Sequence, residues 1–327
     1  MASHTFSSAQ ARGSNGHQAM AAQNTYHLII SMYAMGARVG LVGTGMMGKA
    51  IATRFLNSGY KLVVYNRTRE KAESLEMLGA SIADSPMQVA KNSDLVITVV
   101  KDASAVEQVA LGDNGIIHGK HDGLVLADVS TINPVASKAI AKRLKENGIT
   151  MLDTPVMGGP RLAEQGTLVV MVGGSKETYE KYKKVFDTMG SKTFYLGDNG
   201  AAHAMKLALN LQIAMIALAL SEGITLTKSA GLNPELFLQI LNSTYFKTGM
   251  SENKGPKMIK NNFETTFALR MMMKDLDTIN EAARAFNITL PMASLAEQLY
   301  RAATNSSFAD LDYTGILAFL EKINGLK

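Results

Sequence analysis

The chain has 327 residues, of which 46% are hydrophobic, so it is long and apolar enough for a soluble globular protein with two domains of ordinary size. Its formal net charge is +5, but basic residues stand beside acidic ones along the chain, and we therefore expect no nucleic-acid groove. The sequence contains no cysteine, which excludes disulfides, thiolate metal ligands and cysteine nucleophiles.

Residues 1–36 differ in composition from the rest of the chain. They are rich in Ala, Ser, Gln and Asn, and they contain no acidic residue. This composition predicts a disordered leader or an added extension, with Met32 or Met35 as alternative starts. Neither a secretory signal nor a mitochondrial presequence fits it well, so we expect a cytoplasmic protein, with an organelle presequence as the alternative.

From residue 37 onward, short β-branched runs alternate with longer helical segments. The runs expected to form strands are ARVGLVG, KLVVYN, DLVITVV, LVLADVS and ITMLDTPV. Such alternation is typical of a Rossmann-type, doubly wound parallel sheet of the α/β class. LVVMVGG and KTFYLG follow as two further strands, without the same regular helices between them, so the predicted dinucleotide-binding domain spans residues 37–197.

Residues 198–327 are predicted to form an all-helical domain for substrate binding and oligomerisation. A long helix starts near residue 200 and ends at Gly231, and Asn233 and Pro234 begin the next one. The most apolar stretch, LNLQIAMIALAL, is shorter than the roughly 20 residues that a bilayer requires. We therefore predict a buried helix and no membrane span.

Three glycines directly after the first predicted strand form a G-x-G-x-x-G pattern. Gly43 permits a tight turn, Gly45 leaves room for a pyrophosphate, and Gly48 lets helix and strand approach closely. The amino end of the following helix favours the phosphate charge. The other loop residues expected against the cofactor are Thr44, Met46 and Met47.

The second predicted strand ends on Asn66, where an NAD-binding protein normally carries an acidic residue for the ribose hydroxyl. An amide followed by Arg67 and Thr68 would accept a 2′-phosphate that a carboxylate would repel. This turn predicts NADP(H) as the preferred cofactor, with NAD(H) as the alternative. The competing interpretation is a solvated basic turn.

Four further segments carry a resemblance to a known family. They are DVSTINP from Asp128, DTPVMGGPRLAEQGTLVVMVGG from Asp153, GAAHAMKLALN from Gly200, and MKDLD around Lys274. Together with GLVGTGMMG, they make residues 37 to about 320 resemble the β-hydroxyacid dehydrogenase family. That family includes 3-hydroxyisobutyrate dehydrogenase and the glyoxylate and succinic semialdehyde reductases.

The resemblance implies a catalytic role for Lys206. Reduction of a carbonyl by hydride leaves an alkoxide, which needs a proton donor beside it, and Lys206 is the candidate. Asn210 lies one helical turn later and is expected to orient the lysine or the substrate. For the helix taken alone, a surface lysine with a buried stem is the competing interpretation.

The resemblance also implies where the substrate and the cofactor lie. Ser130 and Thr131 follow a strand at the carboxyl edge, where open α/β sheets bind ligands, and they are expected to hold the substrate carboxylate together with Gly158 and Gly159. Ordinary turn chemistry is the alternative for both segments. The further positions expected to line the cofactor are Val100, Lys101 and Lys274.

The sequence departs from the family pattern at Met157, where a serine normally precedes the two glycines. The loss of a hydroxyl indicates a larger or less polar substrate, and Arg161 is a candidate to pair with a more distant carboxylate. Lys101 also departs, because the family tends to proline there. The histidines fall singly and predict no metal site; His203 is expected to pack near the site or line its entry.

The predicted activity is NADP(H)-dependent interconversion of a short carboxylated aldehyde or ketone, of the semialdehyde or glyoxylate type, with its hydroxyacid. The alternatives are an NAD-dependent 3-hydroxyisobutyrate dehydrogenase and a non-catalytic dinucleotide-binding module. A related imine-reducing branch usually lacks a lysine at the position of Lys206. The several apolar faces of the helical domain predict an oligomer, and the resemblance implies a homodimer or homotetramer.

Overall fold

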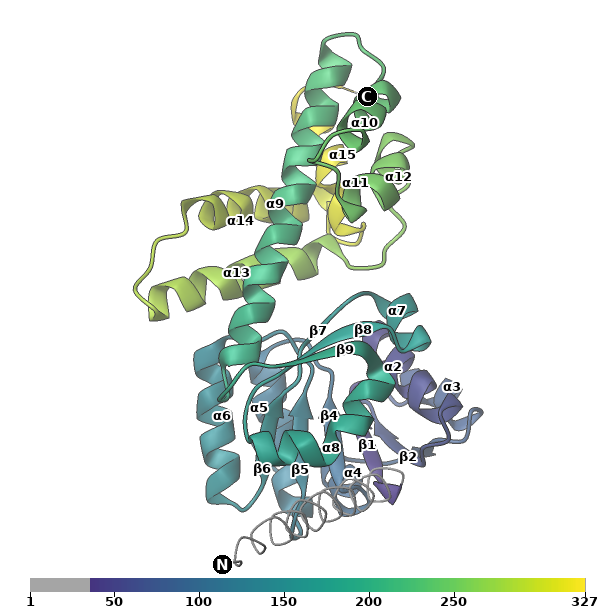
Figure 1. The fold of residues 1–327 in the computed structure, drawn as a ribbon, viewed down its shortest axis with the longest axis vertical. Helices are drawn as coiled ribbons and strands as arrows, with labels where there is room; N and C mark the ends of the chain where they lie inside the picture. Colours follow the sequence, from purple (N-terminus) through teal and green to yellow (C-terminus); the bar gives the residue numbers. More distant parts are fainter. Residues whose placement is uncertain (1–35, 327) are drawn as a thin grey trace, which may run out of the picture.

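The structure is a computed structural model that describes residues 36–326, so the predicted leader lies outside the described residues except for Gly36. The first half of the described chain builds a six-stranded, wholly parallel sheet in the order β3-β2-β1-β4-β5-β6 (Figure 1). The chain order changes direction between β1 and β4, which is the switch point of a doubly wound fold. The strands are β1 (Val39–Val42), β2 (Leu62–Tyr65), β3 (Ser81–Ile82), β4 (Leu95–Thr98), β5 (Val125–Asp128) and β6 (Thr150–Asp153).

Helices connect successive strands of this sheet and cover both of its faces. The connecting helices are α2 (Met46–Asn57), α3 (Glu70–Glu76), α4 (Pro86–Lys91), α5 (Ala103–Leu111), the short turn η1 (Ile116–Gly119) and α6 (Pro134–Glu146). Alternate residues of β4 enter different cores: Leu95 and Ile97 pack with α2, whereas Val96 packs with α4, α5 and α6. Because strand side chains alternate between faces, a strand buried on both sides is apolar nearly throughout; in LVIT only Thr98 is polar, and its buried hydroxyl donates to Asp128.

A second, three-stranded sheet follows, in the order β7-β8-β9. Its strands are β7 (Val156–Met157), β8 (Leu168–Val172) and β9 (Gly190–Tyr195), with β7 antiparallel to β8. The predicted strand ITMLDTPV is therefore divided between two sheets. Two helices also occur here, α7 (Pro160–Gln165) and α8 (Lys176–Met189).

The expectation of no regular helix between LVVMVGG and KTFYLG was wrong, because α8 fills that interval. Its charged residues lie on the outer face, while Tyr179, Tyr182 and Phe186 are buried at helical spacing. The many charges of KETYEKYKKVFDTM hid this amphipathic pattern. Figure 1 shows α8 against the parallel sheet.

The strands end at Tyr195, and the remaining elements are helical. The long predicted helix is confirmed as α9 (Ala201–Ser229), which is followed by Gly231 at a φ of +72°. The predicted cap of the next helix, α10 (Pro234–Asn242), is also present: Asn233 Oδ1 accepts the Glu235 N–H at 2.8 Å. The other elements are α11 (Gly249–Asn253), α12 (Gly255–Ile259), α13 (Leu269–Ala285), α14 (Pro291–Ala303), η2 (Thr304–Phe308), η3 (Tyr313–Gly315) and α15 (Ile316–Ile323).

Helix α9 has 29 residues and is long and apolar enough, by length and composition alone, to cross a membrane. The sequence prediction considered only the 12 residues LNLQIAMIALAL and therefore underestimated the length of the apolar helix. It runs through the helical part of the molecule and contacts α10, α13, α14 and α15 (Figure 1). This is the arrangement of a central packing helix, although only 44% of its most apolar window is buried. The absence of a membrane span stays a prediction.

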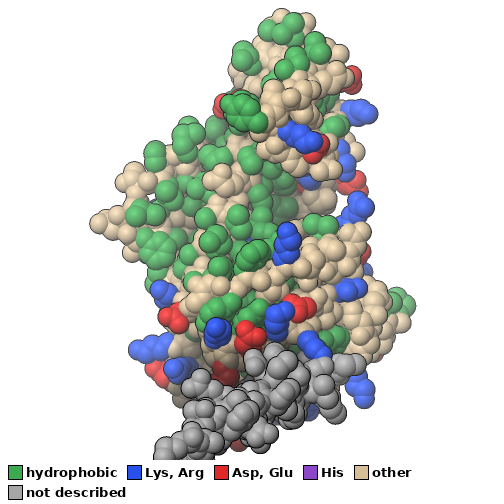
Figure 2. All heavy atoms as spheres, viewed as in Figure 1, with side chains coloured by type: hydrophobic (Ala, Val, Ile, Leu, Met, Phe, Trp, Pro, Cys, Tyr) green, Lys and Arg blue, Asp and Glu red, His purple; other side chains and the backbone are tan. Residues whose placement is uncertain are grey.

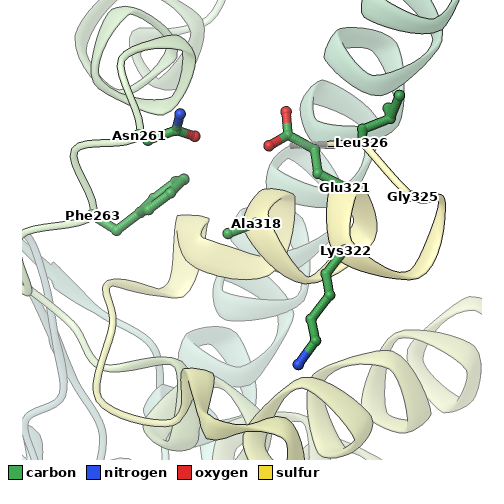
Figure 3. A pocket seen from close by; sticks show the side chains of 7 residues that line it. All are labelled: Asn261, Phe263, Ala318, Glu321, Lys322, Gly325 and Leu326. Atoms are coloured by element: carbon green, nitrogen blue, oxygen red, sulfur yellow. The ribbon is translucent and has the colours of Figure 1, made fainter.

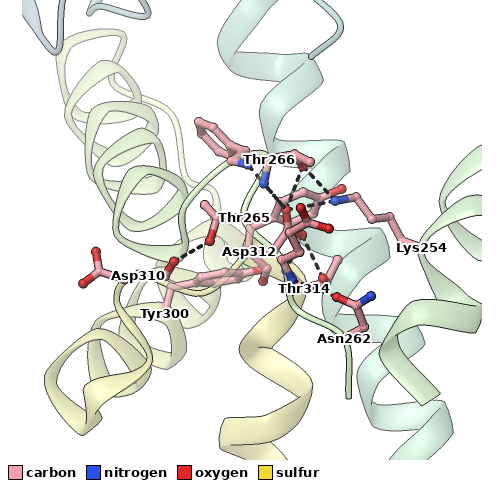
Figure 4. Close-up of polar contacts among 11 residues, drawn as sticks. Lys254, Asn262, Thr265, Thr266, Tyr300, Asp310, Asp312 and Thr314 are labelled. Carbon is pink, nitrogen blue, oxygen red and sulfur yellow. Dashed lines mark hydrogen bonds and ion pairs between the residues drawn. The ribbon is translucent and has the colours of Figure 1, made fainter. Parts of the chain in front are cut away.

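Asp312 organises the polar contacts that hold the loop before α13 against the loop before α15 (Figure 4). The carboxylate is buried, and its Oδ2 accepts hydrogen bonds from Lys254 Nζ at 2.9 Å and from Thr266 Oγ1 at 2.8 Å. Its Oδ1 accepts the Thr314 hydroxyl at 2.8 Å. Burial would raise the pKa of Asp312, but the hydrogen bonds from Lys254 and Thr266 outweigh burial and hold the pKa below its ordinary value.

Replacing Asp312 by Ala is expected to lower the free energy of unfolding by about 3 kcal/mol, because it leaves the largely buried Lys254 ammonium without its carboxylate. Urea unfolding at pH 7 measures this. Since the folded pKa lies below the unfolded one, the contribution is present above the unfolded value and is lost as pH falls through the folded value. The difference between wild type and variant must therefore shrink towards pH 3; a difference that stays constant contradicts the assignment.

Candidate active site

The glycine loop lies between β1 and α2 at the carboxyl edge of the sheet. Gly43 has a φ of +101°, and a Cβ there would collide with the Val99 carbonyl, just as a Cβ on Gly48 would collide with the Gly43 carbonyl. Gly45 is exposed with nothing near its missing Cβ, and as the residue before α2 it provides no side-chain cap. The first N–H groups of α2, at Met46 and Met47, are therefore left for an anion, which fits a dinucleotide pyrophosphate.

Asn66 joins this loop to the turn after β2. Its Oδ1 accepts the Thr44 N–H at 3.0 Å, and its Nδ2 donates to the Thr68 carbonyl at 2.9 Å. An aspartate could accept the first bond but could not donate the second. Arg67 and Thr68 are exposed beside it, whereas the next arginine, Arg69, is paired with Asp84 at 2.8 Å.

Lys206 lies on α9 and contacts the start of the second sheet. Its Nζ donates to Met157 Sδ at 3.1 Å, directly before Gly158 and Gly159. Burial lowers the pKa of Lys206 to about 8; the nearby Asp275 opposes this shift, and the charge of Lys274 adds to it. Met157, where the sequence departs from the family pattern, therefore contacts the predicted proton donor directly.

A chain of polar contacts joins α9 to the loop after β5. Asn210 Nδ2 donates to Asp275 Oδ2 at 2.6 Å, and Asp275 Oδ1 lies 2.6 Å from Lys274 Nζ. Lys274 Nζ in turn donates to the Thr131 carbonyl at 2.8 Å. Asn210 was predicted to orient Lys206 or to hydrogen-bond the substrate, and both roles stay predictions; the hydrogen bond that the structure gives its amide nitrogen goes to Asp275 on α13.

Ser130 connects the same loop to the strand beside the glycine loop. Its Oγ accepts the Val100 N–H at 3.0 Å, and its own N–H donates to the buried Asp128 at 3.2 Å. Val100 also packs within reach of Gly43. The predicted substrate and cofactor segments are thus adjacent, at the edge where doubly wound sheets bind ligands.

Gly158 and Gly159 keep their backbone accessible beside Met157. Gly158 is exposed and has a φ of +126°, which a residue with a side chain rarely adopts. Gly159 is partly exposed and precedes α7 without a side-chain cap. Both leave N–H groups near Lys206 that suit a carboxylate.

The side chains of two predicted residues are not joined to this network by a hydrogen bond or an ion pair within residues 36–326. Lys101 is exposed, and its Nζ lies 3.7 Å from Asp102 of its own loop. Arg161 is exposed at the second position of α7, the helix that packs on α2. The prediction for Lys101 concerned its backbone beside the cofactor, and the prediction for Arg161 concerned a more distant substrate carboxylate, so both stay predictions.

Several functional candidates were missed or undervalued in the sequence. Asp275 was treated only as a neighbour of Lys274, yet it is buried and binds Asn210. His203 was expected to pack near the site or line its entry; it is buried, and Asp128 and Asp153 both face it. The available signal was that both aspartates end apolar strands, where parallel strands bring their carboxyl ends together.

A hollow of about 450 Å³ lies elsewhere, in the helical part of the molecule (Figure 3). None of its lining residues belongs to the predicted site. They are Asn261, Phe263, Ala318, Glu321, Lys322, Gly325 and Leu326. In the described part of the chain, no cluster of three or more His, Asp or Glu residues could hold a metal ion.

The glycine loop and the doubly wound sheet define a dinucleotide-binding fold of the Rossmann type, and comparisons with known proteins identify the family. Residues 38–197 match the family model described as the NAD binding domain of 6-phosphogluconate dehydrogenase. Residues 200–320 match the model described as NAD-binding of NADP-dependent 3-hydroxyisobutyrate dehydrogenase.

Among curated proteins, the chain is 33% identical to glyoxylate/succinic semialdehyde reductase 2 of Arabidopsis thaliana, over 86% of this chain and 79% of that protein. It is 29% identical to mitochondrial 3-hydroxyisobutyrate dehydrogenase of Mus musculus, over 87% of each. A solved 3-hydroxyisobutyrate dehydrogenase of Salmonella typhimurium superposes with a TM-score of 0.79 at 27% identity, covering 86% of this chain and 99% of that one. The chain belongs to the β-hydroxyacid dehydrogenase family of NAD(P)-dependent oxidoreductases.

Proposed function

We propose that the protein is an NADP(H)-dependent reductase that converts a short carboxylated aldehyde or ketone, of the semialdehyde or glyoxylate type, into its hydroxyacid. The observation that carries this proposal is Lys206, a lysine with a lowered pKa beside the exposed backbone of Gly158 and Gly159. NADP(H) preference is supported by Asn66 and Arg67, which leave the cofactor turn without a carboxylate at this position.

The chain's own residues divide the chemistry between them. A bound nicotinamide supplies the hydride. Lys206 holds the proton that the carbonyl oxygen requires as its negative charge develops. Ser130 and the N–H groups of Gly158 and Gly159 bind the carboxylate, and Asn210 fixes α9 to α13 through Asp275. The Met157 thioether accepts a hydrogen bond from Lys206 until a substrate displaces it. The apolar Met157 side chain favours substrates with an apolar segment beside the carbonyl.

Carbonyl reduction is expected to depend on the protonated form of Lys206. Because burial lowers the pKa of Lys206 to about 8, kcat/KM for the aldehyde should fall as pH rises through about 8. Hydroxyacid oxidation needs the neutral amine and should rise over the same range. Replacing Asp275 by Asn removes the negative charge that opposes the lowering of the Lys206 pKa. The fall in kcat/KM should therefore occur at a lower pH. A fall in kcat/KM that is centred above about pH 10 contradicts this role of Lys206.

The experiment that tests the function compares NADPH and NADH oxidation against glyoxylate, succinic semialdehyde, methylmalonate semialdehyde and tartronate semialdehyde. Strong NADPH preference with one aldehyde is the expected result and names the substrate. Oxidation of 3-hydroxyisobutyrate with NAD+ as the hydride acceptor instead supports the NAD-dependent alternative. Binding of NADPH with no turnover of these four carbonyls supports a different carbonyl or an imine as substrate, or a non-catalytic binding module.

A homodimer or homotetramer is proposed from the apolar surface of the helical part. Figure 2 shows hydrophobic side chains gathered over this part of the molecule. Those at least half exposed there include Leu226, Leu232, Leu236, Ile240, Ile288, Met292 and Leu295. Surfaces of this kind mark interaction sites in soluble proteins. Cytoplasmic localisation is likewise proposed from the sequence alone.

A further inference from the structure

A buried histidine that the proposed reaction does not use lies between two buried carboxylates. His203 on α9 is fully buried, and neither ring nitrogen has a hydrogen-bond partner among the described residues. Its Nε2 is 3.6 Å from Asp128 Oδ2 and 3.8 Å from Asp153 Oδ1. The two aspartates end β5 and β6 and are register partners, so their carboxyl groups come from adjacent strands.

The two carboxylates differ in the hydrogen bonds that they accept from groups other than the histidine. Asp153 already accepts hydrogen bonds from Ser137 Oγ at 2.6 Å, from Asn199 Nδ2 at 3.0 Å and from the Gly200 N–H. Asp128 accepts two bonds on Oδ1, from Thr98 and Ser130, but its buried Oδ2 has no hydrogen-bond partner. Asp128 is therefore the group that requires His203.

Among the described residues, His203 is the only charged group that acts on the pKa of Asp128. Burial raises the pKa of Asp128, and the charge of His203 and the bonds to Ser130 and Thr98 oppose that shift. On α6, Lys138 passes over Gly200 but is exposed to solvent. A buried charge without a partner is strongly unfavourable, so a proton must lie on the carboxyl or on the imidazole.

We propose that Asp128 and His203 share one proton and that His203 is a positioning residue for Lys206 and Ser130. Asp128 fixes Ser130 through the backbone N–H at 3.2 Å, and His203 precedes Lys206 by three residues on α9. The pair therefore sets the distance between the residue that binds the carboxylate and the residue that donates the proton. This inference rests on the proposed function for its catalytic consequence only.

Three variants of the holoenzyme test the proposal by charge balance: His203→Gln, Asp128→Asn and the two combined. His203→Gln leaves two buried carboxylates without a cation, and the midpoint of thermal unfolding should fall by about 5 °C or more. The double variant should recover at least half of this loss, because one of the two charges is then removed. Equal or greater loss in the double variant, or no loss in His203→Gln, overturns the shared proton.

Turnover separates positioning from simple packing. In His203→Gln, kcat should fall about tenfold while the NADPH dissociation constant stays within about twofold, and the double variant should regain part of kcat. The unfolding measurements need no turnover, so they decide this inference even if no carbonyl is reduced.

Discussion

Replacing Lys206 by Ala is expected to lower kcat for aldehyde reduction about 1,000-fold, while the dissociation constant for NADPH stays within about twofold. Lys206 Nζ contacts Met157, directly before Gly158 and Gly159, and Lys206 is not among the predicted cofactor contacts, so its loss removes the proton donor and should leave those contacts intact. Stopped-flow NADPH oxidation and NADPH fluorescence titration measure the two quantities. Alanine keeps α9 helical, so the fold should be preserved.

A matched control for this variant is Lys176→Ala, an exposed lysine at the first position of α8. It changes the net charge by the same amount and should leave turnover unchanged. If Lys206→Ala keeps more than about a tenth of wild-type turnover, proton donation by Lys206 is excluded, and a different group or water must supply the proton.

Replacing Asn66 by Asp is expected to raise the KM for NADPH about 10- to 100-fold and to change the KM for NADH much less. The new carboxylate would repel the 2′-phosphate and could no longer donate to the Thr68 carbonyl. It would keep the bond from the Thr44 N–H, so the glycine loop should stay in place. Steady-state kinetics with both cofactors give the preference ratio.

The two neighbouring arginines provide an internal comparison for this prediction. Arg67 is exposed, and Arg67→Ala should weaken NADPH but not NADH. Arg69 is paired with Asp84, so Arg69→Ala should change both cofactors little. An unchanged ratio in Asn66→Asp and Arg67→Ala would mean that this turn does not select the cofactor.

The sequence by itself determined the class of fold, the long helix α9 and the family. Strand and helix periodicities are local, and a sheet buried on both faces requires nearly continuous apolar runs such as LVIT. The glycine loop was predictable because Gly43 and Gly48 meet steric demands that any side chain would violate. Likewise, Asn233 caps α10 through bonds to its near neighbours, which sequence patterns reveal.

Only the tertiary structure decided how these pieces meet. It divided ITMLDTPV between two sheets, formed α8 from a segment whose charges concealed its apolar face, and turned Asn210 towards Asp275. It also brought His203 to Asp128 and Asp153, which lie 75 and 50 positions earlier in the chain. Such contacts form between polar side chains that the folded core shields from water. Packing between distant segments decides which side chains these are.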